Sequence, residues 1–256
     1  MNYLAVAKTD VGIVKQKNQD SLTVKKANIN GEPVVFAVLC DGMGGLEQGE
    51  VASATVIRRF ENWFVSDFPR LLTEGFSHQL LREQWEGLIT KLNEKIQAYG
   101  KQNSIRLGTT ITTLLLYDGC YYISHVGDSR AYEIGEELTI LTQDQTVVAM
   151  EIKKGLLTEE QAKTDPRRSI LLQCVGASDV VVPDFYMGEI KENAVYMLCS
   201  DGFRHEITPS EIQSCFSPSV IQTKEEMEYY AEYLIELNKS RKERDNITVV
   251  LVRTYE

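Results

Sequence analysis

Short apolar runs separated by turns recur along the chain and predict β-strands. They lie near residues 3–8, 21–27, 33–40, 110–117, 120–127, 130–134, 181–187, 194–200 and 247–253. Consecutive runs are joined by short turns such as Asp118-Gly119, whereas parallel strands would need a crossover helix between every pair. The pattern therefore predicts sheets that are mainly antiparallel.

Three longer segments repeat apolar residues at the spacing of an α-helix. The aligned residues are Ala52, Val56, Phe60, Trp63 and Phe64 in the first, Leu81, Trp85, Leu88, Leu92, Ile96 and Tyr99 in the second, and Met227, Tyr230, Ala231, Leu234 and Leu237 in the third. We expect the first two helices to pack on a sheet and the third to cover the opposite side. The fold class predicted is α+β, a four-layer αββα sandwich of two stacked antiparallel sheets flanked by helices.

Length and composition favour one domain over residues 1–256, because no internal repeat or low-complexity linker is present. A net charge of -10 argues against nucleic acid as a partner. No apolar run is long enough to cross a membrane, and the first residues lack a secretion signal, so we expect a cytoplasmic protein. The five cysteines include no CxxC pair, which favours buried, reduced thiols; a regulatory role for Cys40 and Cys199 is the alternative.

Four apolar strands carry an aspartate at one end. Asp41 and Asp201 each follow such a run and precede a glycine, Asp128 follows a third run, and Asp245 stands just before the last one. A single Asp-Gly pair is typical of an ordinary turn. Several strand-terminal acids instead indicate one shared cation site, because carboxylates brought together without a counter-charge repel each other and take up protons.

The donor types favour a hard cation, Mg²⁺ or Mn²⁺. The three histidines form no HExxH spacing, and the acids are too far apart in the sequence for a calcium loop. Acids converging from separate strands suit two cations about 3.5–4 Å apart, which activate a water and clamp a phosphoryl oxygen. The glycine segment 41–45 has neither P-loop nor dinucleotide-binding spacing. Hydrolysis of a phosphate ester is therefore predicted.

Six ordered motifs resemble those of the metal-dependent protein phosphatases of the type 2C (PPM) family, in particular its compact bacterial members. They are GIVKQKNQD at 12–20, DGMGG at 41–45, GTT at 108–110, GDSR at 127–130, SDG at 200–202 and DNIT at 245–248. The resemblance covers nearly the whole chain. It implies a pair of antiparallel sheets flanked by helices and an enzyme, a protein-serine/threonine phosphatase that depends on Mn²⁺ or Mg²⁺.

The resemblance also implies roles for individual residues. Asp41 would bridge two metal ions, with Asp201 and Asp245 completing one of them, the Gly42 carbonyl serving the other and Asp20 acting through water.

A third ion is implied at Asp128, which would share Asp201, and Asn246 would orient Asp245. By this resemblance Asp41, Asp201 and Asp245 would be the catalytic residues. A metal-bridging hydroxide would attack phosphorus directly, with no covalent enzyme intermediate.

Departures from the family pattern concern substrate binding. Lys15 stands where the family usually has an arginine, so phosphate contact is expected to be weaker; an ordinary solvated lysine is the alternative. Met43 replaces the histidine general acid of many eukaryotic relatives. His125 is expected to be a hydrogen-bonded core or edge residue, and His205 is the better candidate acid, although a surface turn is its default interpretation.

Residues 144–176 resemble the family's flap, a mobile helical insert beside the active site. Gln145 and Thr146 replace a frequent His-Ser pair. Arg167 and Arg168 could attract an acidic phosphopeptide, or they could merely offset nearby acids.

The main hypothesis is a monomeric phosphatase that acts on phosphoSer and phosphoThr proteins and reverses a bacterial Ser/Thr kinase. Lys15 and the altered flap motivate an alternative, a pseudophosphatase that binds phosphoproteins with weak or no turnover. A third interpretation is a phosphohydrolase of small molecules.

Overall fold

Two five-stranded antiparallel sheets form the centre of the molecule in the computed structural model, which describes residues 1–43 and 48–256. The first sheet has the order β1 (Asn2–Asp10), β10 (Ile247–Tyr255), β9 (Val195–Cys199), β6 (Arg130–Ile134) and β7 (Leu138–Ile140). The second has the order β2 (Ser21–Ile29), β3 (Glu32–Cys40), β4 (Ile111–Tyr117), β5 (Cys120–Val126) and β8 (Asp184–Glu189).

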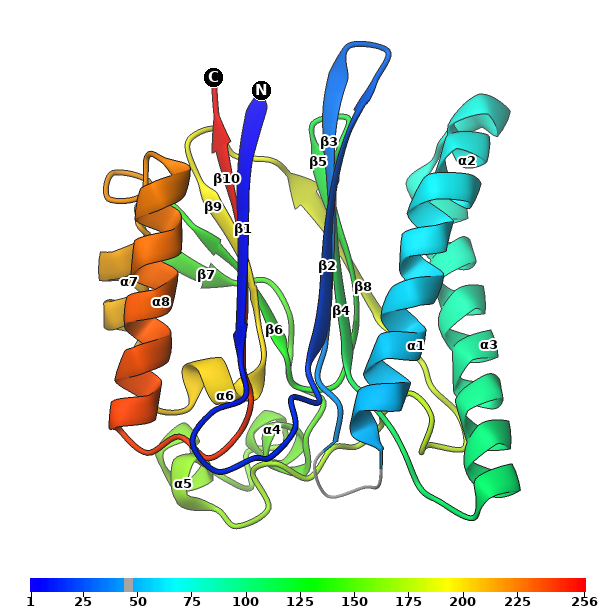
Figure 1. Ribbon diagram of the computed structural model, residues 1–256, viewed down its shortest axis with the longest axis vertical. Helices are drawn as coiled ribbons and strands as arrows, with labels where there is room; N and C mark the ends of the chain where they lie inside the picture. Colours follow the sequence, from blue (N-terminus) through cyan, green and yellow to red (C-terminus); the bar gives the residue numbers. More distant parts are fainter. Residues whose placement is uncertain (44–47) are drawn as a thin grey trace.

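Helices cover the outer face of each sheet (Figure 1). The second sheet is covered by α1 (Gly49–Asn62), a π-helical turn η1 (Trp63–Asp67), α2 (Phe68–Gly75) and α3 (His78–Asn103). The first is covered by α7 (Pro209–Phe216) and α8 (Lys224–Ser240). Three short helices, α4 (Val147–Lys153), α5 (Glu159–Thr164) and α6 (Asp201–Arg204), lie at one end of the sheets. The predicted four-layer sandwich is confirmed.

Three apolar clusters hold these layers together. One packs α1, α2 and α3 on the second sheet, another packs α7 and α8 on the first, and the third lies between the sheets. β3 contributes to two of them, because Phe36 and Val38 face the helices while Val35 and Ala37 face the other sheet. This burial on both faces explains why the β3 sequence is continuously apolar.

The termini lie together at the end of the first sheet that is distant from α4, α5 and α6 (Figure 1). β1 and β10 pair along their whole length, with Asn2 opposite Tyr255 at one end and Asp10 opposite Ile247 at the other. The residues that precede β10 therefore lie beside the end of β1.

Two details differ from the sequence prediction. β8 begins at Asp184 rather than near residue 181, because Pro183 has no N–H for a ladder hydrogen bond. Tyr99 was expected on the buried face of its helix but is 41% exposed. In that last turn Gly100 makes the close contact instead: an added Cβ there would lie 2.8 Å from the Ile105 carbonyl oxygen.

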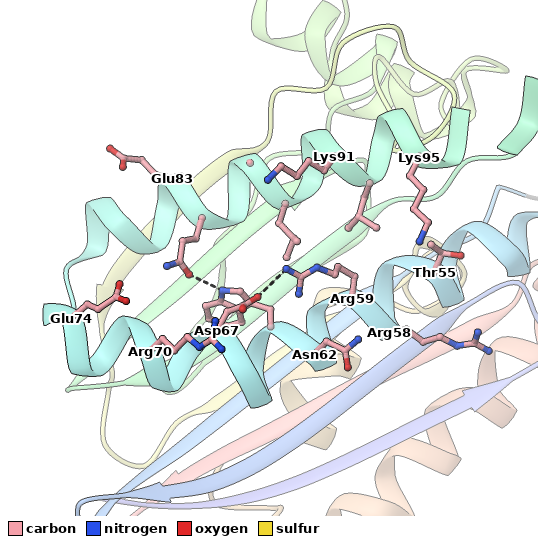
Figure 2. A pocket seen from close by; sticks show the side chains of 15 residues that line it. Thr55, Arg58, Arg59, Asn62, Asp67, Arg70, Glu74, Glu83, Lys91 and Lys95 are labelled. Atoms are coloured by element: carbon pink, nitrogen blue, oxygen red, sulfur yellow. Dashed lines mark hydrogen bonds and ion pairs between the residues drawn. The ribbon is translucent and has the colours of Figure 1, made fainter. Parts of the chain in front are cut away.

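A groove of about 720 Å³ lies between α1 and α3 on the outside of the molecule. Figure 2 shows its polar lining, in which Arg59 pairs with Asp67 at 2.9 Å. Trp63, another lining residue, donates a hydrogen bond to Gln84. None of the strand-terminal acids lines this groove. Within residues 1–43 and 48–256, no helix has the length and apolar character needed to span a membrane.

Candidate metal centre

Five aspartates from separate segments converge at the end of the sandwich near α6. We call them the carboxylate cluster: Asp20, Asp41, Asp128, Asp201 and Asp245. Asp20 precedes β2, Asp41 follows β3, Asp128 lies between β5 and β6, Asp201 opens α6 and Asp245 precedes β10. The charges of the other four all raise the pKa of Asp41, as expected of carboxylates that share a confined site.

Burial and mutual repulsion raise the pKa of three members of the cluster. Burial is the main cause at Asp41, whose pKa lies well above its usual value. Burial also raises the pKa of Asp20 to about 7, against the effect of a hydrogen bond from Thr248. The pKa of Asp128 rises to about 7 as well, by burial and by the charge of Asp201. This site thus has an excess of negative charge that a cation would relieve.

The donor atoms fit a divalent cation that prefers oxygen. Asp20 Oδ1 and Asp201 Oδ1 are buried and accept no hydrogen bond from the part of the chain described here. Carboxylate oxygens of this kind are the ligands that Mg²⁺ and Mn²⁺ prefer. However, no three acid, histidine or cysteine side chains among the described residues are already arranged around one ion position. Asp245 instead forms an ion pair with Lys15, with Nζ 2.9 Å from Oδ1.

The motif at residues 12–20 is held against the motif at residues 245–248 by hydrogen bonds and by close packing of the backbone. The Asn246 side chain donates hydrogen bonds to the carbonyls of Val11 and Lys17 and accepts one from the Gln19 N–H. A Cβ added at Gly12, where φ is +75°, would lie 2.4 Å from the Asp245 carbonyl oxygen. These contacts hold the loop that contains Lys15 against Asp245 and Asn246, which places Lys15 beside Asp245.

Asn246 acts on Asp245 through its backbone rather than its side chain. Its N–H donates to Asp245 Oδ1 at 2.8 Å, while its side chain binds the loop described above. That Asn246 orients Asp245 stays a prediction, and the contact that would do so is made by its backbone.

Hydrogen bonds also join Asp41, at the start of the motif at 41–45, to Thr110 in the motif at 108–110. The Asp41 N–H donates to Thr110 Oγ1, and the Thr110 N–H donates to the Asp41 carbonyl, both at 2.9 Å. Gly42 donates to the Gln19 carbonyl and is packed so tightly that an added Cβ would lie 2.5 Å from the same oxygen. Gly44 and Gly45 of this motif lie outside the described residues. The metal-binding role of the Gly42 carbonyl stays a prediction.

His205 lies between two acids rather than in a surface turn. Its Nε2 is 3.6 Å from Asp201 Oδ2, and its Nδ1 is 3.6 Å from Glu243 Oε2. Burial acts to lower its pKa, but Glu243 and Asp201 outweigh this and raise it. Sequence reasoning missed Glu243, which is buried and also accepts hydrogen bonds from the backbone of Arg244 and Asp245.

His125 is a core residue, as predicted. It is fully buried, with Nδ1 3.0 Å from Thr112 Oγ1 and Nε2 3.0 Å from the Gly127 carbonyl oxygen, to which it donates. Burial lowers its pKa to about 4, although the nearby Asp144 and Asp184 charges act in the opposite direction. The neutral ring is therefore the folded form.

This burial predicts an acid-sensitive contribution to stability. Because the His125 pKa is lower in the folded protein than in the unfolded chain, its contribution is complete above about pH 6.5 and is lost as pH falls to about 4. When pH is lowered from 7 to 5, we expect His125 to reduce the free energy of unfolding of the wild-type protein by about 2 kcal/mol, and we expect this reduction to be absent in His125→Asn. Urea unfolding at both pH values checks this; equal losses in the two proteins would contradict it.

Residues 144–176 form two short helices, α4 and α5, beside the cluster. Arg167 pairs with Asp165 at 2.8 Å and with Glu151 at 2.9 Å, so it offsets acids within this segment, as the alternative interpretation expected. Gln145 is buried, donates to Asp184 and accepts from the Gly127 N–H. Its side chain thus binds the backbone of Gly127, the residue before Asp128.

The five cysteines are free thiols. Cys40 and Cys199 are fully buried, and burial raises the pKa of both, which disfavours the reactive thiolate. The structure therefore favours the interpretation of these thiols as core residues over a regulatory one.

Comparison with known proteins identifies the family to which this chain belongs. Residues 13–237 match the family model described as Protein phosphatase 2C. The chain belongs to the protein phosphatase 2C family. Protein phosphatase PhpP of Streptococcus pneumoniae is 32% identical over 97% of this chain and 96% of that protein.

Solved structures of protein phosphatase 2C relatives share the whole fold. The serine/threonine phosphatase of S. agalactiae has a TM-score of 0.84 at 27% identity, covering 99% of this chain and 100% of that one. The catalytic domain of the phosphatase PstP, solved with two manganese ions, has a TM-score of 0.77 at 28% identity, covering 99% of both chains. Family membership and these relatives support a protein phosphatase function, and metal dependence is characteristic of the family.

Proposed function

We propose that this chain is a Mn²⁺- or Mg²⁺-dependent phosphatase of phosphoSer and phosphoThr proteins. The observation that carries the proposal is the carboxylate cluster, in which burial and the charges of the other four acids raise the pKa of Asp41, and two buried carboxylate oxygens have no partner among the described residues. A relative of the same fold was solved with two manganese ions. The residues that we propose as ligands of two core ions and of a third ion are Asp20, Asp41, Gly42, Asp128, Asp201 and Asp245.

Asp41, Asp201 and Asp245 are the proposed catalytic residues. When bound, the ions supply an activated water and neutralise charge on the phosphoryl group. The chain itself holds these carboxylates in place through the backbone contacts of Asp41 with Thr110 and of Asn246 with Asp245. Lys15 lies at the cluster and presents an ammonium group to a substrate phosphate.

The substrates that we propose are phosphorylated proteins, including those modified by a bacterial Ser/Thr kinase, in the cytoplasm. The S. agalactiae relative is a serine/threonine phosphatase and the S. pneumoniae relative is a protein phosphatase, which supports this substrate class. We expect the protein to act as a monomer, with residues 144–176 as a flap beside the site.

Hydrolysis assays with and without Mn²⁺ test the proposal. We expect turnover of p-nitrophenyl phosphate and of a phosphothreonine peptide that a chelator abolishes and that added Mn²⁺ restores. Peptide binding without turnover would support the pseudophosphatase alternative. Rapid hydrolysis of phosphorylated metabolites with little action on the peptide would support a small-molecule phosphohydrolase.

Replacing Lys15 tests its contact with phosphate. Lys15→Ala is expected to raise the KM for a phosphothreonine peptide about 10-fold, because a hydrogen bond to a charged group contributes about 1.5–3 kcal/mol. Lys15→Arg is expected to preserve or raise activity, since guanidinium binds phosphate through two parallel hydrogen bonds. Lys17→Ala is the matched control, because Lys17 is in the same loop but pairs with Glu50 and is 72% exposed. An unchanged KM in Lys15→Ala would contradict the assignment.

A further inference from the structure

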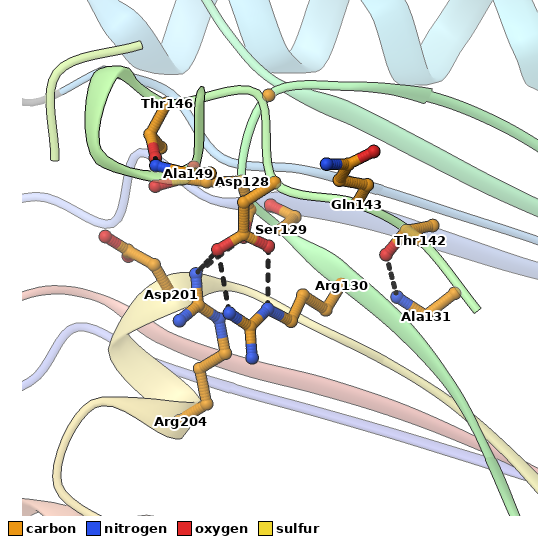
Figure 3. Close-up of polar contacts among 12 residues, drawn as sticks. Asp128, Ser129, Arg130, Ala131, Thr142, Gln143, Thr146, Ala149, Asp201 and Arg204 are labelled. Carbon is orange, nitrogen blue, oxygen red and sulfur yellow. Dashed lines mark hydrogen bonds and ion pairs between the residues drawn. The ribbon is translucent and has the colours of Figure 1, made fainter. Parts of the chain in front are cut away.

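Arg204 is a buried cation at the carboxylate cluster that the sequence analysis did not single out. It lies three residues after Asp201, at the end of α6, and its side chain is 13% exposed. Its Nη2 donates to the Asp128 carbonyl at 2.8 Å and to Asp144 Oδ2 at 3.2 Å. Figure 3 shows the Arg204 side chain next to that of Arg130 and close to Asp128. One guanidinium thus contacts two segments that lie 60 or more residues away in the sequence.

Arg130 completes the arrangement by binding the same carboxylate. Its Nε and Nη2 donate to the two oxygens of Asp144 at 2.7 and 2.8 Å. We call Arg130, Asp144 and Arg204 the charged triad. A buried triad of this kind contributes little net stability, because desolvation of the charges offsets their attraction. Arg204 Nε, moreover, has no hydrogen-bond partner among the described residues. Stability alone is therefore a poor explanation for it.

The charged triad joins three segments that meet at the cluster. Arg204 continues the helix that Asp201 opens, Asp128 lies in the turn between β5 and β6, and Asp144 is the first residue of the flap. The next residue, Gln145, donates its N–H to the Gly127 carbonyl and accepts from the Gly127 N–H. The Asp128 turn is thus held from one side by Arg204 and from the other by the beginning of the flap.

We propose that Arg204 is a positioning residue that fixes the spacing of Asp128 and Asp201 and links the flap to the carboxylate cluster. The loss of a group that orients metal ligands typically lowers metal affinity 10–100-fold, so ion binding depends on Arg204. The order of the flap depends on Arg204 as well, because Arg204 binds Asp144, the first residue of the flap. This inference rests on the proposed function, since it assumes that the cluster binds metal ions.

Two variants separate the geometry of the guanidinium from its charge. Arg204→Met keeps the length of the side chain but removes every donor, whereas Arg204→Lys keeps the charge and loses the planar fork. In Arg204→Met we expect Mn²⁺ affinity, measured by titration calorimetry without substrate, to fall about 10-fold or more. We expect faster tryptic cleavage in the flap at Lys153 and Lys154, which are exposed. Arg204→Lys should restore part of each effect.

Arg253→Met is the matched control. Arg253 is also a buried arginine with an unpartnered Nε in the described structure, and its Nη2 also binds oxygen atoms, those of Asn193 and Pro218. No residue of the cluster is among its partners. We expect a lower melting temperature in this variant with unchanged Mn²⁺ affinity and an unchanged rate of flap cleavage.

The other outcomes overturn the proposal in distinguishable ways. Arg204→Met with wild-type Mn²⁺ affinity and flap cleavage would show that Arg204 does not position the site. Full restoration by Arg204→Lys would show that charge alone acts. Equal losses of Mn²⁺ affinity in the Arg204 and Arg253 variants would reduce the effect to general destabilisation. Wild-type protein that binds no Mn²⁺ and hydrolyses no phosphate ester would refute the proposed function and this inference with it.

Discussion

Asp41→Asn is expected to abolish phosphatase activity and to raise the melting temperature of the metal-free protein at neutral pH. Burial and the other members of the carboxylate cluster hold the pKa of Asp41 well above its usual value. Folding therefore favours the protonated form, and the free energy of unfolding falls as pH rises from the unfolded pKa of about 3.9 through the folded one. Asparagine removes this cost because it is neutral and of the same shape.

The two effects are measured separately. We expect kcat on p-nitrophenyl phosphate with Mn²⁺ to fall at least roughly 100-fold, as when a group that stabilises the transition state is removed. In chelator, the melting temperature should rise by at least roughly 3 °C at pH 7.5 and by less at pH 5, given roughly 2–4 °C per kcal/mol for a chain of this size.

Asp118→Asn is the control for this charge removal. Asp118 is an exposed residue in the turn between β4 and β5, with a φ of +51° that asparagine also adopts. Neither activity nor melting temperature should change there. Retained turnover in Asp41→Asn would contradict the proposed site, and a lower metal-free melting temperature would contradict the electrostatic argument.

Gly202→Ala is expected to destabilise the protein and to impair catalysis. An added Cβ at Gly202 would lie 2.2 Å from the Asn246 backbone oxygen and 3.2 Å from Asp245 Cβ, so one of these two segments must shift. Overpacking of this kind costs about 1–3 kcal/mol. Because Gly202 directly follows Asp201, the shift separates Asp201 from Asp245, and a displacement of about 1 Å can lower the rate about 100-fold.

Thermal unfolding and kcat/KM with Mn²⁺ measure the two consequences. Gly87→Ala is the matched control, since Gly87 is also in a helix but an added Cβ would meet no atom within 4 Å. There alanine should raise stability by about 1 kcal/mol through its higher helix propensity, with no change in kcat/KM. Wild-type kcat/KM in Gly202→Ala would show that the close packing of this glycine does not set the site geometry.

The fold followed from the sequence wherever burial was strong enough to leave a pattern. β3 is buried along its length from Val34 to Cys40, and its apolar run was easy to recognise. β7 was missed because it has only three residues, Leu138–Ile140, with Ile140 47% exposed. η1 continues the first predicted helix and contains two of its aligned residues, Trp63 and Phe64. α2 was missed because Pro69 interrupts the helical pattern; in the structure Pro69 occupies the first turn of α2, where no N–H is needed.

The candidate site was predictable as a set of acids but not as a network. Asp41, Asp128, Asp201 and Asp245 each stand next to a strand, which is a signal that periodicity can reveal. The partners that hold them carry no such signal. Arg204 and Asp144 are 60 residues apart, and only the folded sheets bring their charges to 3.2 Å. Glu243 resembled an ordinary solvated acid in a charged segment until its burial against His205 was visible.

The position of the chain ends gives experimental access to the enzyme. Asn2 pairs with Tyr255 at the far end of the first sheet, whereas Asp245 and the rest of the acids gather where β10 begins. An affinity tag, a fluorophore or an attachment to a solid support at either end would therefore leave the end of the sandwich that holds the carboxylate cluster open. Since the two ends are neighbours, a short peptide could also join them, and the chain could be reopened at the turn between β4 and β5 to give a circular permutant.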